Sequence, residues 1–181
     1  CFARLRPELA AQGIRLDTWH ELSDAQRREA CEYFDSHVSP ALTPLSLGPS
    51  NPFPFMSNLS TSWGFVLRDL ETAETLHVRV KVPPTIKQWL PLRCDVPEGE
   101  RCFVSLHEIV LNNAHKLFPG VTIEQATLFR VSRNADIAIE EDRDNSIREL
   151  VEEQIRQRRF QPVVRLEFGE SPRAEILHGL V

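Results

Sequence analysis

The sequence predicts an α+β fold, in which helices cover a mixed β-sheet and a short helical segment comes first. The pattern predicts this fold because segments that alternate apolar and polar residues, as strands do, occur between segments whose apolar residues recur at helical spacing. The composition agrees, since 41% hydrophobic and 26% charged residues are close to the average of globular chains and exclude collagen, coiled coil and disorder. A length of 181 residues suits one domain, or one domain with a fragment of another.

The first 37 residues are predicted to be mainly helical. Ser23 and Gln26 have the spacing of a capping box, in which each side chain bonds the backbone of the other at a helix start. Gly13 stands where a chain leaves a helix in left-handed geometry. The predicted elements are a helix end at residues 4–12, an extended stretch at residues 14–16 and a helix from residue 24 to about residue 37.

A proline-rich connector is predicted to follow. Pro40 ends the helix, and residues 38–59 hold five prolines, which are too many for a helix or a central strand. We place the domain boundary at the start of this connector. Residues 1–38 would then end an N-terminal helical domain, and residues 39–181 would form a second domain.

A hairpin, two shorter strands and a helix are predicted next. In the second arm of the hairpin, residues 75–82, apolar and basic residues alternate, so one face is expected to be core and the other basic. Ser105 and Glu108 form a second capping-box pattern that opens a helix, which residues 118–120 stop. The predicted strands are residues 61–69, 75–82, 89–93 and 101–106.

The C-terminal third is predicted to contain more strands and helices. Acidic residues crowd the start of one helix and arginines its end, as the helix dipole favours. Ser171 caps a last helix that Val181 cuts short, so we expect the chain to be a piece of a longer protein and its second domain to be truncated. The predicted elements are strands at residues 127–133, 135–140 and 163–168 and a helix at residues 144–159.

Charge and cysteine usage limit the partners that we expect. The formal net charge is -5 and no basic tract is present, so we expect no nucleic-acid partner. No window holds the roughly 18 to 20 apolar residues of a membrane helix, so we expect no transmembrane segment. Cys94 and Cys102 have a spacing that allows them to face each other across a hairpin, but free thiols are the interpretation we favour, and they imply an intracellular protein.

Common signatures of catalysis are missing. The seven glycines are scattered singly, so the sequence has neither a phosphate-binding loop nor a dinucleotide fingerprint. The G-x-S-x-G and H-E-x-x-H motifs are also missing. We expect no metal site, because His107 and His115 do not share a helix face and the acidic run at residues 140–144 fits the start of a helix.

Basic residues on two predicted strands are the candidate binding site. Arg79 and Lys81 alternate with apolar residues on one strand, together with His77, and Arg130 and Arg133 lie on another. If the strands are neighbours, these cations would form a surface for a polyanion. The alternative is a solvated sheet face or structural ion pairs.

Short motifs in a fixed order resemble the bacterial polyphosphate kinase family, whose members make long-chain polyphosphate from ATP. The resemblance covers nearly the whole chain. Ser132 and Asn134 depart from it, since a threonine and an aspartate are more usual there, and residues 94–101 form a longer loop than is common. The motifs are WHELS at residues 19–23, LTPL at 42–45, NPFPF at 51–55, SNLS at 57–60, RVKVP at 79–83, LFPG at 117–120 and FRVSRNAD at 129–136.

The resemblance implies that the chain is the end of the N-terminal domain and the middle, or head, domain of a four-domain enzyme, with a fold similar to phosphohistidine phosphatases. The family transfers the terminal phosphoryl group of ATP to polyphosphate through a phosphohistidine, with Mg²⁺. Its nucleophile and Mg²⁺ ligands would lie after Val181, so we carry over no catalytic residue, and we expect the chain alone to bind no cofactor and to be inactive. The head would help to form a dimer and border the polyphosphate tunnel, in the cytoplasm or peripheral to the inner membrane.

Two other hypotheses remain open. One is a stand-alone phosphohistidine phosphatase-like enzyme on the related fold, with His77 or His107 as its nucleophile. The other is an interaction module, in which apolar residues 52–55 and Trp63 dock a partner, although burial of such aromatic residues in a core is the interpretation we favour.

Overall fold

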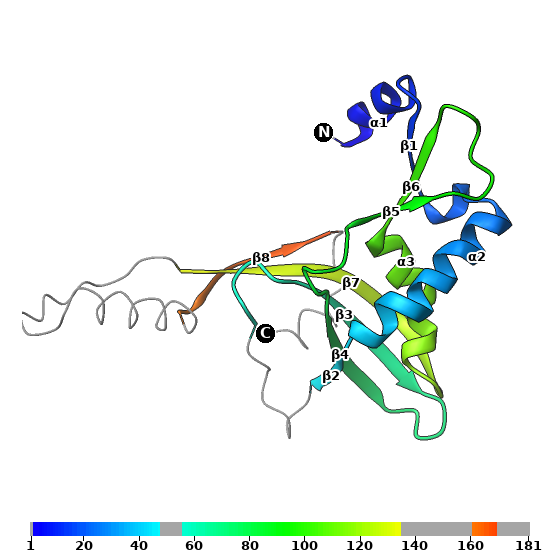
Figure 1. Cartoon of the computed structure of the whole chain (residues 1–181). Helices are drawn as coiled ribbons and strands as arrows, with labels where there is room; N and C mark the ends of the chain where they lie inside the picture. Colours follow the sequence, from blue (N-terminus) through cyan, green and yellow to red (C-terminus); the bar gives the residue numbers. More distant parts are fainter. Residues whose placement is uncertain (1, 48–55, 135–160, 170–181) are drawn as a thin grey trace, which may run out of the picture. The chain divides into compact units, whose positions relative to one another are not determined.

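The computed structural model describes residues 2–47, 56–134 and 161–169, and in this part of the chain the fold is α+β, as predicted (Figure 1). Its strands form two separate sheets, one of three strands and one of five. The elements are α1 (Phe2–Ala10), β1 (Ile14–Asp17), η1 (Trp19–Glu21), α2 (Asp24–Tyr33), η2 (Phe34–Val38), η3 (Ser39–Ala41), β2 (Pro44–Leu47), β3 (Thr61–Asp69), β4 (Thr75–Lys81), β5 (Trp89–Leu92), β6 (Arg101–Ser105), α3 (Leu106–Asn113), η4 (Ala114–Leu117), β7 (Val121–Arg133) and β8 (Val163–Phe168).

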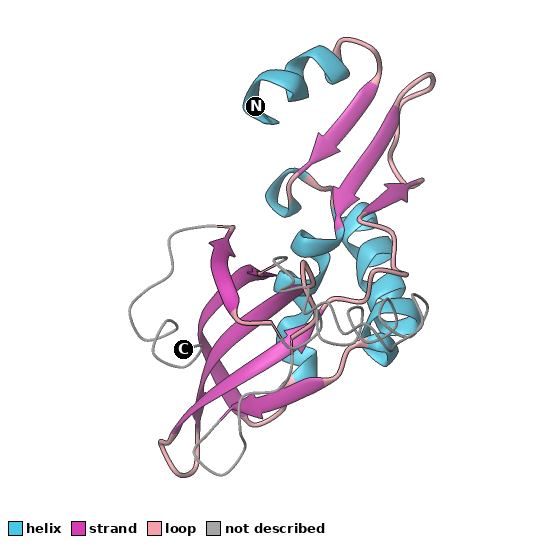
Figure 2. Ribbon diagram, turned by 90° about the vertical axis from the view of Figure 1, so that its left-hand side faces the viewer, coloured by secondary structure: helices cyan, strands magenta, loops and turns pink. Residues whose placement is uncertain are grey.

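The three-stranded sheet joins the N-terminal residues to the middle of the chain. Its strand order is β1-β6-β5, with β1 parallel to β6 and β5 antiparallel to it. Gly13 leaves α1 in the predicted left-handed geometry, at φ +72°, and its carbonyl accepts a hydrogen bond from the Arg101 N–H at 2.7 Å. Helix α1, which carries the N-terminus in Figure 2, contacts β1. Sequence patterns predicted each of these elements but not the pairing of β1 with β6.

Helix α2 begins with the predicted capping box. The Gln26 N–H donates to Ser23 Oγ at 3.2 Å, and the Ser23 N–H donates to Gln26 Oε1 at 3.0 Å. Two buried residues, Phe34 and Val38, anchor the π-helical turn η2 that continues α2. The helical stretch ends in η3, which contains Pro40, as predicted.

The second predicted capping box is half formed. Ser105 Oγ accepts a hydrogen bond from the Glu108 N–H at 3.2 Å, so the predicted N-cap of α3 is confirmed. The Glu108 carboxylate, however, accepts from the Trp19 N–H at 3.1 Å rather than turning back to Ser105. An unpaired amide at the start of η1 is thus satisfied by a residue distant in sequence, which explains why the local pattern was misleading.

The five-stranded sheet has the order β2-β4-β3-β7-β8. The predicted hairpin is confirmed as β3 and β4, and the predicted last strand as β8, which is antiparallel to β7 with a register shift at Ser132 and Arg133. The connector contains a strand that we did not predict. Strand β2 begins at Pro44 and lies at the edge of the sheet, where a proline is tolerated because its missing N–H breaks no ladder.

An apolar cluster lies on one face of this sheet. Val66 of β3 packs there with Phe129 and Val131 of β7, and Leu166 and Phe168 of β8 pack against the cluster. Leu47 and Met56 complete it. Trp63 is 6% exposed, in agreement with burial rather than display of this aromatic residue. This cluster covers one face of the sheet, and residues that alternate with it along the strands, such as Phe65 and Val80, are buried as well.

Residues on both sides of the expected domain boundary belong to one compact unit. The first unit comprises Cys1–Pro44, Arg68–Glu74 and Pro83–Ile123, and the second comprises Leu45–Leu67, Thr75–Val82 and Glu124–Val181. These compact units are not the two expected domains and do not test where one domain ends and the next begins. The domain boundary at residue 38 stays a prediction. The predicted strand 135–140, the acidic run 140–144, the helix 144–159, the helix opened by Ser171 and the docking residues 52–55 lie outside the described residues.

None of the described helices is both long and apolar enough to cross a membrane.

Gly13 and Gly99 allow a test of the turn that starts β1. Both have positive φ, +72° and +83°, but a Cβ on Gly13 would lie 3.0 Å from the Gly99 carbonyl oxygen, whereas a Cβ on Gly99 would meet nothing within 4 Å. We expect Gly99→Ala to lower the free energy of unfolding by about 1–2 kcal/mol and Gly13→Ala to lower it further. Urea denaturation of both variants checks this, and equal losses would contradict it.

Candidate functional site

Arg79, the first predicted anion-binding residue, is not on a solvated face. It is 3% exposed, and its Nε donates to Ser62 Oγ of the neighbouring strand β3 at 3.1 Å. Burial lowers the pKa of the Arg79 guanidinium. The expectation of an exposed basic face is therefore wrong at this residue, because the face that carries Arg79 is also the face of the buried Val66.

Lys81 is the predicted cation that remains exposed. It ends β4, and no described residue gives it a hydrogen bond or an ion pair. His77, two strand positions before Arg79, is half-buried. Backbone hydrogen bonds at both ends of the β3–β4 hairpin set one register, in which Ser62 lies opposite Lys81.

Arg130 is part of a cross-strand ion pair. Its Nε donates to Glu167 Oε2 of β8 at 2.6 Å, and the two residues are register partners. Arg130 alternates along β7 with two residues of the apolar cluster, so it lies on the opposite face from Arg79. The hydrogen bond from Arg130 lowers the pKa of the Glu167 carboxyl. Arg130 therefore forms a structural ion pair, which was the alternative to an anion-binding surface in the sequence analysis.

Arg133 joins three segments of the chain. Its Nε donates to the Met56 carbonyl at 2.9 Å, its Nη1 donates to the Gln161 carbonyl at 2.6 Å, and its backbone N–H donates to Asn58 Oδ1 at 2.9 Å. These bonds fix the segment before β3 and the segment before β8 against the end of β7. The Arg133 guanidinium thus stabilises this end of the sheet by bonding two backbone carbonyls.

The four predicted cations do not form one exposed patch. Arg79 is buried, Arg130 is paired on the other face, and Arg133 binds backbone carbonyls, which leaves Lys81 facing solvent. That any of them binds polyphosphate stays a prediction.

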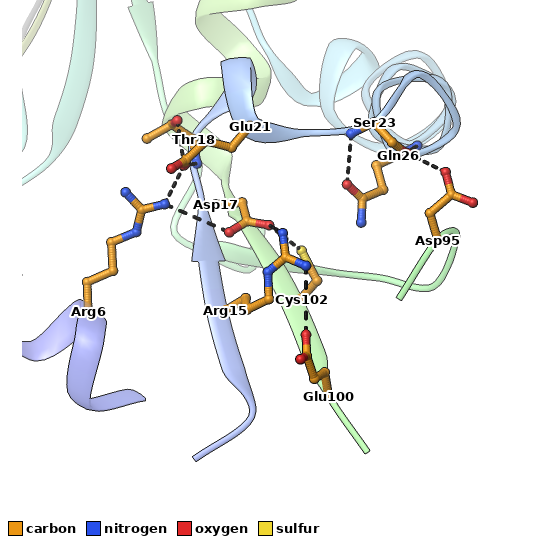
Figure 3. Close-up of polar contacts among 10 residues, drawn as sticks. All are labelled: Arg6, Arg15, Asp17, Thr18, Glu21, Ser23, Gln26, Asp95, Glu100 and Cys102. Carbon is orange, nitrogen blue, oxygen red and sulfur yellow. Dashed lines mark hydrogen bonds and ion pairs between the residues drawn. The ribbon is translucent and has the colours of Figure 1, made fainter. Parts of the chain in front are cut away.

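A second polar cluster, centred on Asp17, was not predicted (Figure 3). The Asp17 side chain is 6% exposed and ends β1. Arg15 Nη2 donates to its Oδ2 at 2.7 Å, Arg6 Nη2 lies 3.8 Å from its Oδ1, and Cys102 Sγ donates to its Oδ2 at 3.1 Å. Burial tends to lower the pKa of Arg15, but the charge and hydrogen bond of Asp17 outweigh burial and raise it. The contact of Cys102 with Asp17 depends on the unpredicted pairing of β1 with β6, so no local pattern signalled it, whereas Arg15 and Asp17 are two residues apart on the same strand.

The thiols of the described residues are free, as favoured. Burial, with the hydrogen bond to Asp17 second, raises the pKa of Cys102 to about 12. Cys94 is exposed, and its hydrogen bond with Glu29 raises its pKa as well. Neither thiol is thus disposed to form the thiolate that a nucleophile or metal ligand requires.

The histidines offer little support for chemistry of their own. Burial lowers the pKa of His107, which is half-buried on α3, while His115 is exposed on η4. Among the described ranges, no three histidine, cysteine, aspartate or glutamate side chains are grouped so that they could hold a metal ion. Whether His77 or His107 acts as a nucleophile stays a prediction.

Comparison with known sequences gives one consistent result. A family profile described as "Polyphosphate kinase middle domain" matches residues 25–181. A polyphosphate kinase from Synechocystis sp. is 42% identical over 174 residues, covering 92% of this chain and 24% of the relative. One from Mycobacterium avium is 38% identical over 173 residues, with the same two coverages. The chain thus spans about a quarter of the length of these curated relatives.

A solved structure has the same fold. The crystal structure of polyphosphate kinase from Porphyromonas gingivalis matches 77% of this chain and 22% of that chain, with a TM-score of 0.65 and 22% sequence identity. At this identity the match concerns the fold alone.

Glu21 allows a test of the polar cluster by pH. The Thr18 N–H and hydroxyl donate to Glu21 Oε2 at 2.8 and 2.7 Å and, with Arg6, lower its pKa from 4.5 to about 2. Because the folded-state pKa is depressed, Glu21 stabilises the fold above pH 4.5, and this contribution is lost as the pH falls toward 2. We expect Glu21→Gln to flatten that part of the stability profile in urea denaturation. The exposed Glu98→Gln is the control, and a profile of Glu21→Gln like that of Glu98→Gln would refute the assignment.

Proposed function

The chain belongs to the polyphosphate kinase family, and we propose that it forms the middle domain, preceded by the end of the N-terminal domain, of an enzyme that transfers the terminal phosphoryl group of ATP to polyphosphate. The match to the middle-domain profile over residues 25–181 carries this proposal. The relatives are about four times as long as the chain, so most of the catalytic machinery is assigned to the remaining domains of the same protein.

The role of this part of the enzyme is proposed to be structural. Arg130 and Arg133 have bonds that hold strands and segments together, and such bonds suit a scaffold better than a site that must release its product. The described residues do not fit a Mg²⁺ site, because no group of three suitable side chains occurs among them. We therefore assign ATP, Mg²⁺ and the phosphorylated histidine to the other domains and derive no chemical step from this chain.

The proposal includes the surroundings of the domain. We propose that it contributes to a homo-oligomer, borders the path of polyphosphate and works in the cytoplasm or peripheral to the inner membrane. The free thiols of Cys31, Cys94 and Cys102 agree with a reducing compartment. Of the four candidate cations, Lys81 is best suited to steer a polyanion, because it is exposed and no described residue pairs with it.

A labelling experiment tests the division of labour. The intact parent protein and this chain are incubated separately with ATP labelled on its terminal phosphate, and each is assayed for acid-labile protein phosphate and for polyphosphate. We expect both signals from the parent and neither from the chain, because the nucleophile is assigned outside it. Circular dichroism confirms that the chain is folded during the assay.

Two outcomes would overturn the proposal. Label on the isolated chain that disappears in His77→Ala or His107→Ala would make that histidine the nucleophile and favour a stand-alone phosphotransferase. A parent that forms no polyphosphate from ATP would refute the proposed reaction.

Lys81 allows a test of polyanion steering. We expect Lys81→Glu to weaken polyphosphate binding by the intact parent about three- to tenfold at low salt, and less at high salt, because the contact is exposed and screened. Filter binding at several salt concentrations measures it. The matched control is Lys87→Glu, an exposed lysine after β4, and equal affinities of the two variants would contradict the assignment. Reversal of Arg79 is no substitute, since it would bury a carboxylate.

A further inference from the structure

Arg79 is a buried cation without a counter-ion among the described residues. Only 3% of the residue is exposed, and the one hydrogen bond that it makes there goes to a neutral group, the hydroxyl of Ser62. No carboxylate of the described residues pairs with it. In contrast, the other inward or interstrand arginines reach a carboxylate or backbone carbonyls, as Arg130 and Arg133 do.

A buried guanidinium without a partner is unfavourable for folding. Arginine stays protonated in proteins, so it cannot escape the loss of hydration by releasing a proton. The cost of removing a charge from water is offset when an anion accepts its hydrogen bonds. Burial lowers the pKa of Arg79, as expected for a guanidinium whose charge is not balanced by a nearby carboxylate. An anion bound at Arg79 would remove the disadvantage.

The residues around Arg79 suit an oxyanion with several acceptor oxygens. The register of the hairpin sets Gly64 opposite Arg79, so β3 itself contributes no side chain at that position, and it sets Ser62 opposite Lys81. Lys81 lies two residues from Arg79 on the same strand face and reaches solvent. This arrangement provides a planar guanidinium, a hydroxyl and a flexible ammonium, all of them hydrogen-bond donors, and no carboxylate of the described residues is bonded to any of the three.

We propose that Arg79, Ser62 and Lys81 hold one phosphate group on the face of the β3–β4 hairpin. Arg79 supplies the buried charge, Ser62 orients the guanidinium, and Lys81 guides the anion from solvent. The phosphate is either a unit of a polyphosphate chain or free inorganic phosphate, which share this chemistry. The choice of polyphosphate rests on the proposed function, whereas the phosphate site rests on the buried, unpaired Arg79.

The experiment measures hydrogen–deuterium exchange of residues 61–82 in the intact parent protein. With inorganic phosphate or with polyphosphate at ten times its dissociation constant, we expect exchange of this hairpin to slow about tenfold. Arg79→Met, an apolar replacement of similar length, is expected to abolish this protection. It is also expected to slow exchange in the absence of phosphate, because the unpaired charge is gone.

Arg130→Met is the matched control, because Arg130 is ion-paired on the opposite face, and it is expected to keep the protection. Arg79→Lys keeps the charge but loses the planar fork, so we expect weaker protection. Arg79→Lys also serves if Arg79→Met fails to fold. The proposal is overturned if neither phosphate nor polyphosphate protects the hairpin, or if protection survives in both Arg79 variants. Faster exchange in phosphate-free Arg79→Met with unchanged protection would overturn it as well, and would indicate a purely structural arginine.

The two ligands distinguish the source of the phosphate. Protection by polyphosphate at concentrations where inorganic phosphate has no effect assigns the site to the chain-like substrate, and equal protection per phosphate assigns it to the free ion. Polyphosphate synthesis by the parent is measured alongside. A parent that makes no polyphosphate but shows protection dependent on Arg79 refutes the proposed function and supports the phosphate site, whereas the reverse result refutes the phosphate site alone.

Discussion

The parallel pairing of β1 with β6 is the interaction on which the first unit depends. It places Ile14 beside Arg101 and Asp17 beside Val104. The left-handed turn at Gly13, the approach of the Cys102 thiol to Asp17 and the bond from Trp19 to Glu108 all require this register. Two parallel strands need a long connection, and residues 18–100 connect β1 to β6. These polar contacts form because β1 pairs with β6, and they in turn favour this register of the two strands over others.

Three arginines of the second unit make different interactions because they differ in burial and in neighbouring groups. Arg130 stands at a strand surface where a cross-strand glutamate is available, so it forms an ion pair. Arg133 stands beside a register shift, and the carbonyls of Met56 and Gln161, which precede strands β3 and β8, accept its donors. Arg79 stands on the buried face next to a neutral hydroxyl. Depth and neighbours, rather than the charge itself, decide whether a guanidinium contributes to stability or is available to a ligand.

The sequence predicted what is encoded locally and missed what is encoded between distant segments. Caps such as Ser23, the hairpin of β3 and β4 and the stop at Gly120 follow from short-range patterns, and the structure contains them. Strand alternation correctly predicted the buried face of β4, on which Val78 and Val80 lie, but did not tell that the opposite face is covered as well, so Arg79 was expected in solvent. Coverage is decided by residues such as Leu47 and Phe129, which lie far away in the sequence. The order of motifs identified the family because such order depends on common descent rather than on physics.

The two compact units interleave along the chain, each being assembled from three separate stretches. Consequently no single cut in the gene separates them, because a crossover between residues 45 and 123 divides both units and one elsewhere in the chain divides one of them. The polypeptide from β1 to β8 therefore behaves in recombination as one indivisible block, although it contains two compact bodies. Chimaeras that preserve both would have their junctions outside this block.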